Sequence, residues 1–405
     1  MPHLPLMFKT VSTDCNLDCT YCYYRQSLEG TRVRRRVQET MLSHLLPEYM
    51  DYVADVGVAS FGWQGGEPTL MGLDFFRRLV ALQERAAKGR SMVISNALQT
   101  NATLVDDEWA RFFADFQFLI GVSLDGPEWV HDVDRRDRGG HGTFRRVMSG
   151  IDAVRRAGVD LNILCVVGPH NVGRASELLA FYRQEGLTHL QFIPAMDFQA
   201  MEPERPPAYL ITPEEYGEFL EVLFDEWYGT AGAPSVSIRI FNNFLQSFLG
   251  IANDLCVHGD RCDAGLVIEH NGDVYPCDFF IDPRWKLGNV LQQPLSAIAS
   301  SADRRAFIGQ KQPLPQECAR CEYVAFCKGG CPRNRLQGMD NSELPDYFCA
   351  SYKRFFAHAS GRLRALQERM VRNARHRDRI ELSPAQRPAD VSDLSEFLAE
   401  RELTS

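Results

Sequence analysis

Apolar segments of strand length alternate with amphipathic helical segments six times before residue 230. The helical segments, such as residues 73–82 and 143–157, carry apolar residues at helical spacing. Because parallel strands need long crossover connections, usually helices, this alternation predicts an α/β fold built on a parallel sheet. The predicted strands are residues 4–11, 56–63, 91–95, 116–123, 161–167 and 189–193.

Polar, glycine-rich or cysteine-rich segments follow several of these predicted strands. Parallel-sheet enzymes place their chemistry at the carboxyl ends of strands, so we expect these segments to meet on one face and form a single site. The segments are the cysteine loop at 15–22, the glycine loop at 64–69, residues 99–101, Ser123 and residues 193–194.

The cysteine loop has the spacing C-x3-C-x2-C, formed by Cys15, Cys19 and Cys22. A loop this short can turn three sulfurs toward one point. Four-iron clusters ordinarily take four thiolates, so three local ligands suggest a cluster with one iron open for chemistry. The alternative is a zinc knuckle that lacks its fourth ligand.

The other cysteines form a second region after about residue 250, where Gly, Pro, Asp and Cys dominate. Residues 266–276 read as a hairpin that turns at Asn271 and Gly272. This composition lacks the apolar content for a core of its own, so we expect metal to substitute for one. Eight cysteines could complete two four-iron clusters, and two zinc sites are the alternative. They are Cys256, Cys262, Cys277, Cys318, Cys321, Cys327, Cys331 and Cys349.

Composition narrows the class of protein and its compartment. The net charge of −9 gives no sign of nucleic-acid binding, and no run of 18 apolar residues predicts a membrane span. The first residues lack the pattern of a signal peptide, so we expect a cytoplasmic protein. Clustered cysteines in that reducing compartment indicate metal rather than disulfides. Cys165 lies apart in a predicted strand, where we expect it to pack as a small apolar residue.

With these motifs in hand, the sequence resembles the radical S-adenosylmethionine (SAM) enzymes, whose C-x3-C-x2-C motif has an aromatic residue, here Tyr21, before the third cysteine. The second cysteine region resembles the SPASM auxiliary-cluster domain of that superfamily. Across roughly residues 1 to 365 the chain is similar to anaerobic sulfatase-maturating enzymes. The matching stretches are residues 64–69, 99–101, 123–127, 162–167, 190–193, 274–279 and 327–331.

This resemblance implies a partial (β/α)6 barrel of triose-isomerase type at residues 1–235, which holds SAM. It also implies a SPASM domain with two auxiliary 4Fe–4S clusters at 236–365. The resemblance ends there. From the residues themselves we expect a basic, amphipathic helix over about 352–375 and a charged helical tail at 366–405, with one short helix at 390–401 and no catalytic role.

The same resemblance implies which residues bind SAM. They are the Tyr21 backbone, Gly66, Ser123, Arg135 and the backbone near Met196. A glycine at position 66 lets a ligand approach closely because it has no Cβ, although the glycine loop could also be an ordinary turn. Arg135 lies in a charge run that normally forms a solvated face.

For function, the resemblance implies oxidation of a Cys or Ser within a C/S-x-P-x-R motif of a sulfatase to Cα-formylglycine. A 5′-deoxyadenosyl radical takes a hydrogen atom from the substrate Cβ, and Asp278 accepts the proton that leaves. Asp278 directly follows Cys277, which places a carboxylate beside a predicted cluster. The alternative is an Asp that binds backbone N–H groups in a turn.

The implied cofactors are three 4Fe–4S clusters and SAM. Auxiliary clusters with four protein ligands cannot bind substrate directly, so we expect them to carry electrons. The expected partners are an unfolded or nascent sulfatase as substrate and an electron donor such as flavodoxin or ferredoxin, without nucleic acid or membrane. By resemblance, one auxiliary cluster is held by Cys256, Cys262, Cys277 and Cys331, and the other by Cys318, Cys321, Cys327 and Cys349.

One departure from the family and three rival functions complete these expectations. Ala102 stands where the family usually has Gly, which carries a cost if the backbone there has a positive φ. The nearest rival is a SPASM enzyme that modifies a ribosomally made peptide, but Cys15 leaves little room for the N-terminal leader-binding domain that many of those carry. The other rivals are an iron–sulfur electron carrier and a zinc-binding interaction protein.

Overall fold

The computed structural model describes residues 4–26, 35–196, 208–230, 232, 234–335 and 344–377. Its framework is a ten-stranded sheet in which β1 to β7 lie side by side in sequence order, each parallel to the next. These strands are β1 Leu6–Lys9, β2 Val58–Gln64, β3 Val93–Thr100, β4 Leu119–Ser123, β5 Leu161–Val167, β6 His189–Pro194 and β7 Ser237–Ile238.

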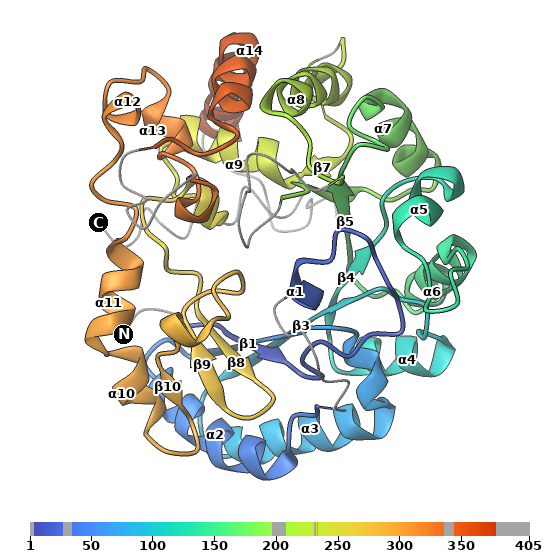
Figure 1. Cartoon of the computed structure of the whole chain (residues 1–405), viewed down its shortest axis with the longest axis vertical. Coiled ribbons are helices and arrows are strands. Elements are labelled where there is room, and N and C mark those ends of the chain that lie inside the picture. Colours follow the sequence, from blue (N-terminus) through green and yellow to red (C-terminus); the bar gives the residue numbers. More distant parts are fainter. Residues whose placement is uncertain are drawn as a thin grey trace.

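Helices connect these strands and cover the outside of the sheet, so the whole forms a partial barrel, as predicted (Figure 1). The start of α4 is capped by Asp106, which accepts backbone hydrogen bonds of 3.0 Å, and α8 begins with a capping box at Thr212. The connecting helices are α2 Glu39–Tyr52, α3 Leu73–Ala87, α4 Asp107–Asp115, α5 Glu128–Asp134, α6 Phe144–Arg156, α7 Ala175–Gln184 and α8 Pro213–Tyr228.

Buried apolar side chains fill the space between the sheet and these helices. Trp63 of β2 stacks on Phe8 of β1 at 4.7 Å between ring centroids, and Phe76 of α3 packs edge-on against Trp63. Cys165 is buried in β5, which confirms its predicted role as a small apolar residue. Ala102, just after β3, has a φ of 57°, so the expected positive φ is present.

The hairpin of the second cysteine region extends the barrel sheet. Strand β8 (Leu266–Glu269) runs parallel to β1 with Leu266 opposite Leu6, and β9 (Asp273–Tyr275) and β10 (Gly288–Asn289) follow antiparallel. All four β8 residues are buried, and Ile268 belongs to the same apolar cluster as the barrel core. The hairpin therefore shares the apolar core of the barrel, while the prediction that metal supports the rest of this region is not contradicted by this packing.

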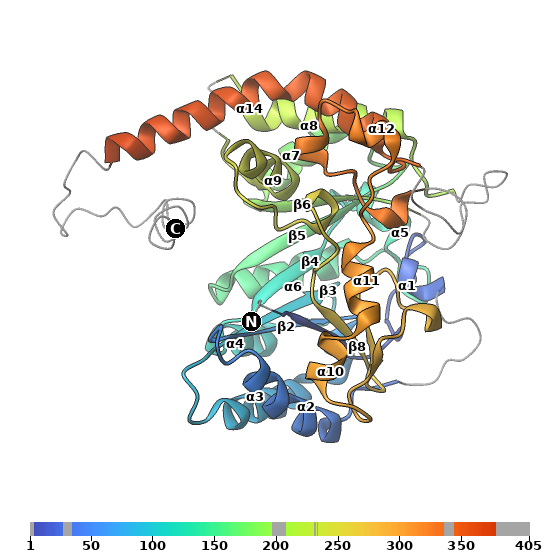
Figure 2. The same ribbon diagram turned by 90° about the vertical axis from the view of Figure 1, so that its left-hand side faces the viewer.

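The remaining helices are mostly short, apart from α9 and the C-terminal helix α14. Phe355 of α14 packs against Phe224 of α8 and stacks on Phe241 of α9, with ring centroids 5.5 and 5.4 Å away. The C-terminal part of α14 projects from the body (Figure 2). These helices are α1 Tyr23–Gln26, α9 Arg239–Phe248, α10 Leu295–Ala299, α11 Ala302–Gly309, α12 Gln316–Ala319, α13 Val324–Cys327 and α14 Cys349–Arg377, with 3-10 turns at Pro68–Met71, Cys256–His258, Pro283–Trp285 and Pro332–Asn334.

The predicted helix over 352–375 is confirmed within α14, whereas the predicted helix at 390–401 lies outside the described residues. Within the described ranges, the helices are too short or too polar to cross a membrane.

Candidate active site

The cysteine loop follows β1 and leads into α1, inside the ring of outer helices (Figure 1). Its three thiols lie close enough to interact electrostatically. Burial, with a smaller contribution from the nearby Cys22 thiol, raises the pKa of the Cys15 and Cys19 thiols to about 12. The structure therefore brings the three predicted ligands together.

Neighbouring loops fix the position of the Cys15 sulfur. The backbone N–H of Leu17 donates to Cys15 Sγ at 3.4 Å, and the side-chain amide of Asn101 donates to it at 3.8 Å. Asn101 also donates to Asn16 Oδ1 at 2.8 Å, which ties the cysteine loop to the end of β3. The predicted segment 99–101 thus holds the cysteine loop.

The glycine loop packs directly on the chain just before Cys15. A Cβ on Gly66 would lie 1.9 Å from the carbonyl oxygen of Asp14, and Gly66 has a φ of 50°. Glu67 donates its N–H to that same carbonyl at 2.9 Å. Gly66 is therefore required for the approach of two backbone segments, which excludes an ordinary surface turn. Its predicted contact with SAM stays a prediction.

Glu67 is fully buried beneath this loop, and burial raises the pKa of its carboxyl group. Its oxygens accept hydrogen bonds from Thr69 N–H and Oγ1, from Thr100 Oγ1 and from Asn101 N–H, at 2.7–3.0 Å. This carboxylate acts electrostatically on Cys15, but its four hydrogen bonds occupy it. Glu67 therefore holds the loop rather than supplying a fourth metal ligand.

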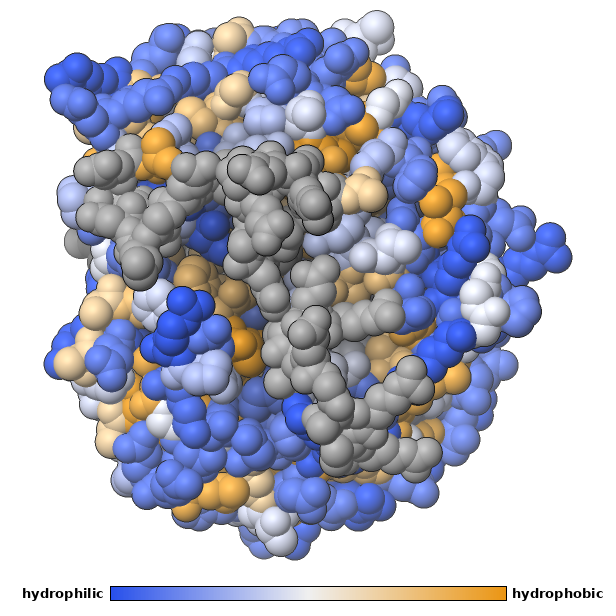
Figure 3. Space-filling view, in the orientation of Figure 1, coloured by the Kyte–Doolittle hydropathy of each residue, from blue (hydrophilic) through white to orange (hydrophobic). Residues whose placement is uncertain are grey.

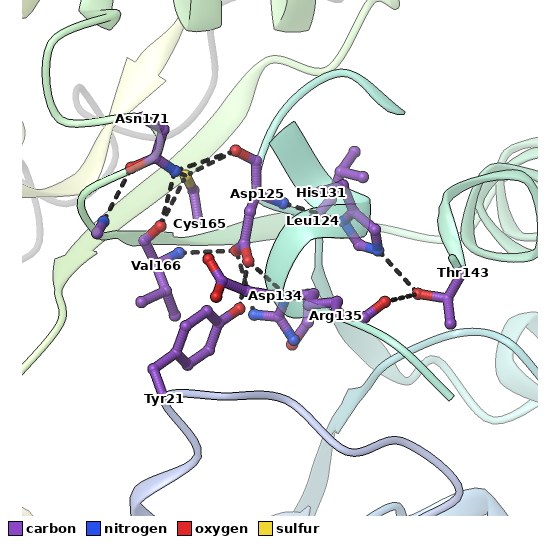
Figure 4. A network of polar contacts seen from close by, with 12 residues as sticks. Tyr21, Leu124, Asp125, His131, Asp134, Arg135, Thr143, Cys165, Val166 and Asn171 are labelled. Carbon is purple, nitrogen blue, oxygen red and sulfur yellow. Dashed lines mark hydrogen bonds and ion pairs between the residues drawn. The ribbon is translucent and has the colours of Figure 1, made fainter. Parts of the chain in front are cut away.

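A buried ion pair anchors the other end of the cysteine loop (Figure 4). Arg135 donates to Asp125 through Nε at 2.8 Å and Nη2 at 3.2 Å, and Tyr21 donates its hydroxyl to the same carboxylate. The guanidinium also lies 5.4 Å from the centre of the Tyr21 ring and interacts with the Cys19 thiol. Arg135 is 7% exposed, so this part of the charge run is not a solvated face.

Ser123 and Met196 lie at the same edge of the sheet as the cysteine loop. Ser123 ends β4, where its hydroxyl accepts a hydrogen bond from the Gln99 amide at 3.1 Å. Met196 is buried two residues beyond β6. The predicted carboxyl-end site is therefore assembled, while the contacts of these residues with SAM stay predictions.

The carboxylate of Asp278 joins the second cysteine region to this site. Asp278 forms an ion pair with Lys9 of β1 and accepts hydrogen bonds from the Tyr23 hydroxyl at 2.7 Å and from the Gln64 amide at 3.1 Å. Lys9 is only 1% exposed, and its ammonium lies 4.5 Å from the centre of the Tyr24 ring. These partners are side chains, so the alternative of a turn Asp bound to backbone N–H groups is not what the structure shows.

Sequence reasoning missed Lys9, Tyr23 and Gln64 as partners of Asp278. The only signal for Lys9 was a single lysine at the end of an apolar strand, and Tyr23 and Gln64 stood next to motifs already recognised. Their pairing with Asp278 spans more than 200 residues of chain, which no local pattern encodes.

In the orientation of Figure 3, apolar side chains are visible in the central part of this face, within a mostly hydrophilic rim.

The eight later cysteines form two groups of neighbouring thiols, and their assignment as cluster ligands stays a prediction. In one group Cys331 acts electrostatically on Cys256, Cys262 and Cys277. We call this the near group, because Cys277 adjoins Asp278.

In the other group, the far group, Cys318 acts on both Cys327 and Cys349, and Cys321 acts on Cys318 and Cys349. Burial raises the pKa of Cys327 to about 12 and that of Cys349 to about 11.

The spacing of these thiols bears on the zinc alternative. Among the described residues, no three His, Cys, Asp or Glu side chains are arranged to hold a single metal ion. In a four-iron cluster each thiolate binds a different iron, so its ligands stand farther apart than those of one tetrahedral zinc. All twelve cysteines are free thiols. The donor sets of three, four and four thiols therefore fit iron–sulfur clusters better than zinc.

Comparisons with known proteins agree with this geometry. The family model of the radical SAM superfamily matches residues 10–181, and that of an iron–sulfur cluster-binding domain matches residues 259–322. The cysteine-type anaerobic sulfatase-maturating enzyme of Clostridium perfringens is 36% identical over 370 residues, which are 90% of this chain and 98% of the relative. The serine-type enzyme of Bacteroides thetaiotaomicron is 33% identical, and the match covers 88% of this chain and 89% of that enzyme.

A solved structure of native anSMEcpe with bound AdoMet and Cp18Cys peptide is also similar, with a TM-score of 0.84 and 34% identity over 91% of this chain and 100% of that chain. The fold and the thiol groups define a radical SAM enzyme with an iron–sulfur cluster-binding domain. Within that class, the chain belongs to the anaerobic sulfatase-maturating enzymes, which oxidise Cys or Ser to formylglycine.

Proposed function

We propose that this chain oxidises the Cys or Ser of a C/S-x-P-x-R motif in an unfolded or nascent sulfatase, with Asp278 as the proton acceptor. The observation that carries the proposal is the position of the Asp278 carboxylate. It contacts Tyr23, one residue after Cys22, and it is one residue from Cys277. The proposed base therefore lies between the two cysteine regions.

Three groups of thiols would hold three 4Fe–4S clusters. Cys15, Cys19 and Cys22 supply three ligands, which leaves one iron for SAM, and the near and far groups supply four each. When bound, SAM and the first cluster supply the 5′-deoxyadenosyl radical that takes a hydrogen atom from the substrate Cβ. Gly66, Ser123, Arg135 and the backbone at Tyr21 and Met196 are the proposed contacts of SAM, since all lie at the carboxyl edge of the sheet.

The residues around Asp278 hold its carboxylate in place. Lys9 forms an ion pair with it. The hydrogen bonds from Tyr23 and Gln64 fix its orientation. Loss of one hydrogen atom, one electron and one proton converts a serine side chain to the aldehyde. A cysteine side chain gives the thioaldehyde, which water converts to the aldehyde with release of hydrogen sulfide.

The partners and compartment follow from this chemistry. An external electron donor such as flavodoxin or ferredoxin would reduce the first cluster before each turnover. Twelve free thiols suit a reducing compartment, which supports a cytoplasmic location. We also propose that residues 1–235 form the SAM-binding barrel, residues 236–365 the auxiliary-cluster domain and residues 366–405 a tail without catalytic groups.

A peptide assay tests the proposal. The reconstituted enzyme is incubated without oxygen with SAM, a reductant and one of two peptides that differ only in having Cys or Ser before x-Pro-x-Arg. We expect a mass change to formylglycine in at least one peptide and one 5′-deoxyadenosine per product. Cleavage of SAM with both peptides unchanged would contradict the proposed substrate and favour modification of another ribosomally made peptide.

A further inference from the structure

One buried cation of the second cysteine region has no carboxylate to balance it. The Lys311 side chain is 1% exposed, and its ammonium donates hydrogen bonds to the backbone carbonyl oxygens of Cys256, Val257 and Gly259 at 2.7, 3.0 and 2.6 Å. Among the ion pairs of the described residues, none includes Lys311. A buried charge without a counter-charge is costly, so a negative group is expected beside it.

The thiols of the near group are the groups that face this ammonium. Lys311 interacts electrostatically with Cys256, Cys262 and Cys331, three of the four proposed ligands. Four thiolates around a four-iron cluster carry a net negative charge, and that charge increases by one on reduction. A cluster held by these thiols would supply the counter-charge that Lys311 lacks, and the ammonium would favour its reduced form.

Arg333 adds a second positive charge on the side of Asp278. Its guanidinium lies 3.6 Å from the centre of the Phe279 ring and interacts with Cys331 and Cys277. Phe279 in turn packs against Tyr23 at 5.1 Å between ring centroids. Arg333 thus lies between the near group and the residues that surround Asp278.

Two carboxyl groups also lie near these cations, and one of them, Asp346, interacts electrostatically with Arg333. Asp278, beside Cys277, is neutralised by Lys9, and Asp346 is a fully buried carboxyl group that accepts the backbone N–H of Cys331 at 2.8 Å. The far group also has two cations nearby. Lys353 there is 41% exposed and is paired with Glu317 at 2.5 Å, whereas Arg335 is buried and acts on Cys318.

We propose that Lys311 and Arg333 raise the reduction potential of the near cluster, so that it is the acceptor of the electron that leaves the substrate carbon. The substrate loses one electron, which makes the near cluster more negative by one unit, and one proton, which goes to Asp278. Charge and atoms therefore balance. This inference rests on the proposed ligand sets, because it needs a cluster at the near group.

Redox titration followed by electron paramagnetic resonance tests the role of the two cations. The test uses a full-length parent variant in which Cys15, Cys19 and Cys22 are replaced by Ala, so that only the two auxiliary clusters contribute signals. We expect Lys311→Met to lower the reduction potential of the near cluster by about 59 mV. At a fixed applied potential, this shift lowers the ratio of reduced to oxidised cluster about tenfold for a one-electron couple. Lys311→Arg, which keeps the charge, should stay within about twofold of the parent ratio.

Two controls make the result decisive. Lys353→Met, beside the far group, should leave the near-cluster potential unchanged. If Lys311→Met fails to load iron, Arg333→Gln replaces it and should shift the near cluster in the same direction. An unchanged near-cluster potential in an iron-replete Lys311→Met or Arg333→Gln protein would overturn the inference. A wrong ligand assignment has a different result, because Cys262→Ala would then leave the near-cluster signal intact.

Discussion

The two cysteine regions are built on different principles. The loop at Cys15 is positioned by hydrogen bonds from loops of the barrel, and its neighbouring charges are already paired or satisfied, as in Arg135 with Asp125 and in Glu67. The near group instead has the cations Lys311 and Arg333 beside it, and the Lys311 ammonium donates its hydrogen bonds to backbone carbonyl oxygens and forms no ion pair among the described residues.

This difference matches the number of thiols in each region. Three thiols leave a metal position open, so the first loop must be held rigidly enough to bind an external ligand. Four thiols close the coordination of a cluster, so the protein can influence only its charge environment. The first region is thus suited to starting a radical reaction and the second to receiving an electron.

The largest expected effect comes from removing one ligand in each region. Cys19→Ala should lower the iron content from about twelve to about eight per chain and abolish SAM cleavage. Cys262→Ala should lose about the same amount of iron and abolish formylglycine formation while SAM is still cleaved. Iron analysis and chromatography of 5′-deoxyadenosine measure the two effects. If Cys262→Ala also abolishes SAM cleavage, the proposed division of labour is wrong.

The next effect tests whether the first loop depends on backbone packing. In Gly66→Ala the new Cβ would overlap the Asp14 carbonyl at 1.9 Å, so the cysteine loop must shift. A displacement of about 1 Å near a reacting centre can lower a rate about a hundredfold, so we expect SAM cleavage to fall by about that factor. Gly173→Ala is the matched control, because its Cβ would meet no atom within 4 Å. Equal rates in the two variants would contradict the packing argument.

A smaller effect is expected where the two regions meet. Tyr23→Phe removes the 2.7 Å hydrogen bond to Asp278 and keeps the ring that packs on Phe279. A hydrogen bond to a charged group contributes about 1.5–3 kcal/mol, and the lower end of that range corresponds to a formylglycine formation rate about tenfold slower, which is the effect we expect. Tyr347→Phe, whose hydroxyl donates to a backbone carbonyl at 3.2 Å, is the control and should match the parent enzyme. A parental rate for Tyr23→Phe would exclude a role for its hydroxyl.

The smallest effect concerns the stability of the barrel. Burial lowers the pKa of His131 from 6.5 to about 4, so the folded protein keeps it neutral while the unfolded chain takes up a proton below pH 6.5. Its contribution is therefore complete above pH 6.5 and is lost as the pH falls toward 4, by about 2 kcal/mol between pH 7 and pH 5. Urea unfolding measures the loss, which His131→Gln should reduce by about that amount. An identical pH dependence in both proteins would refute this assignment.

Much of the fold was predictable from sequence because its signals are local. The predicted boundaries of β5 agree with the structure to the residue and those of α6 to within one residue, since strand and helical patterns are both visible over short windows. The pairing of β8 with β1 was not predictable, because it joins segments about 260 residues apart and the hairpin alone gives no sign of its neighbour.

In the candidate site, too, features with local signals were predictable and features that depend on distant segments were not. The thiol groups followed from spacing and family resemblance, and the structure brings each set together. The environment of Asp278 could not be foreseen, since Lys9, Tyr23 and Gln64 reach it from three separate segments. Lys311 carried no signal at all, because a single lysine in a polar stretch is normally exposed.

The most direct test of the account replaces the proposed base. Asp278→Asn keeps the shape of the side chain and removes its ability to take a proton at neutral pH. With SAM, reductant and a Cys-x-Pro-x-Arg peptide, we expect formylglycine to fall by at least about a hundredfold while 5′-deoxyadenosine is still formed. Formylglycine at the parental rate, in a variant with its full iron content, would contradict the central claim.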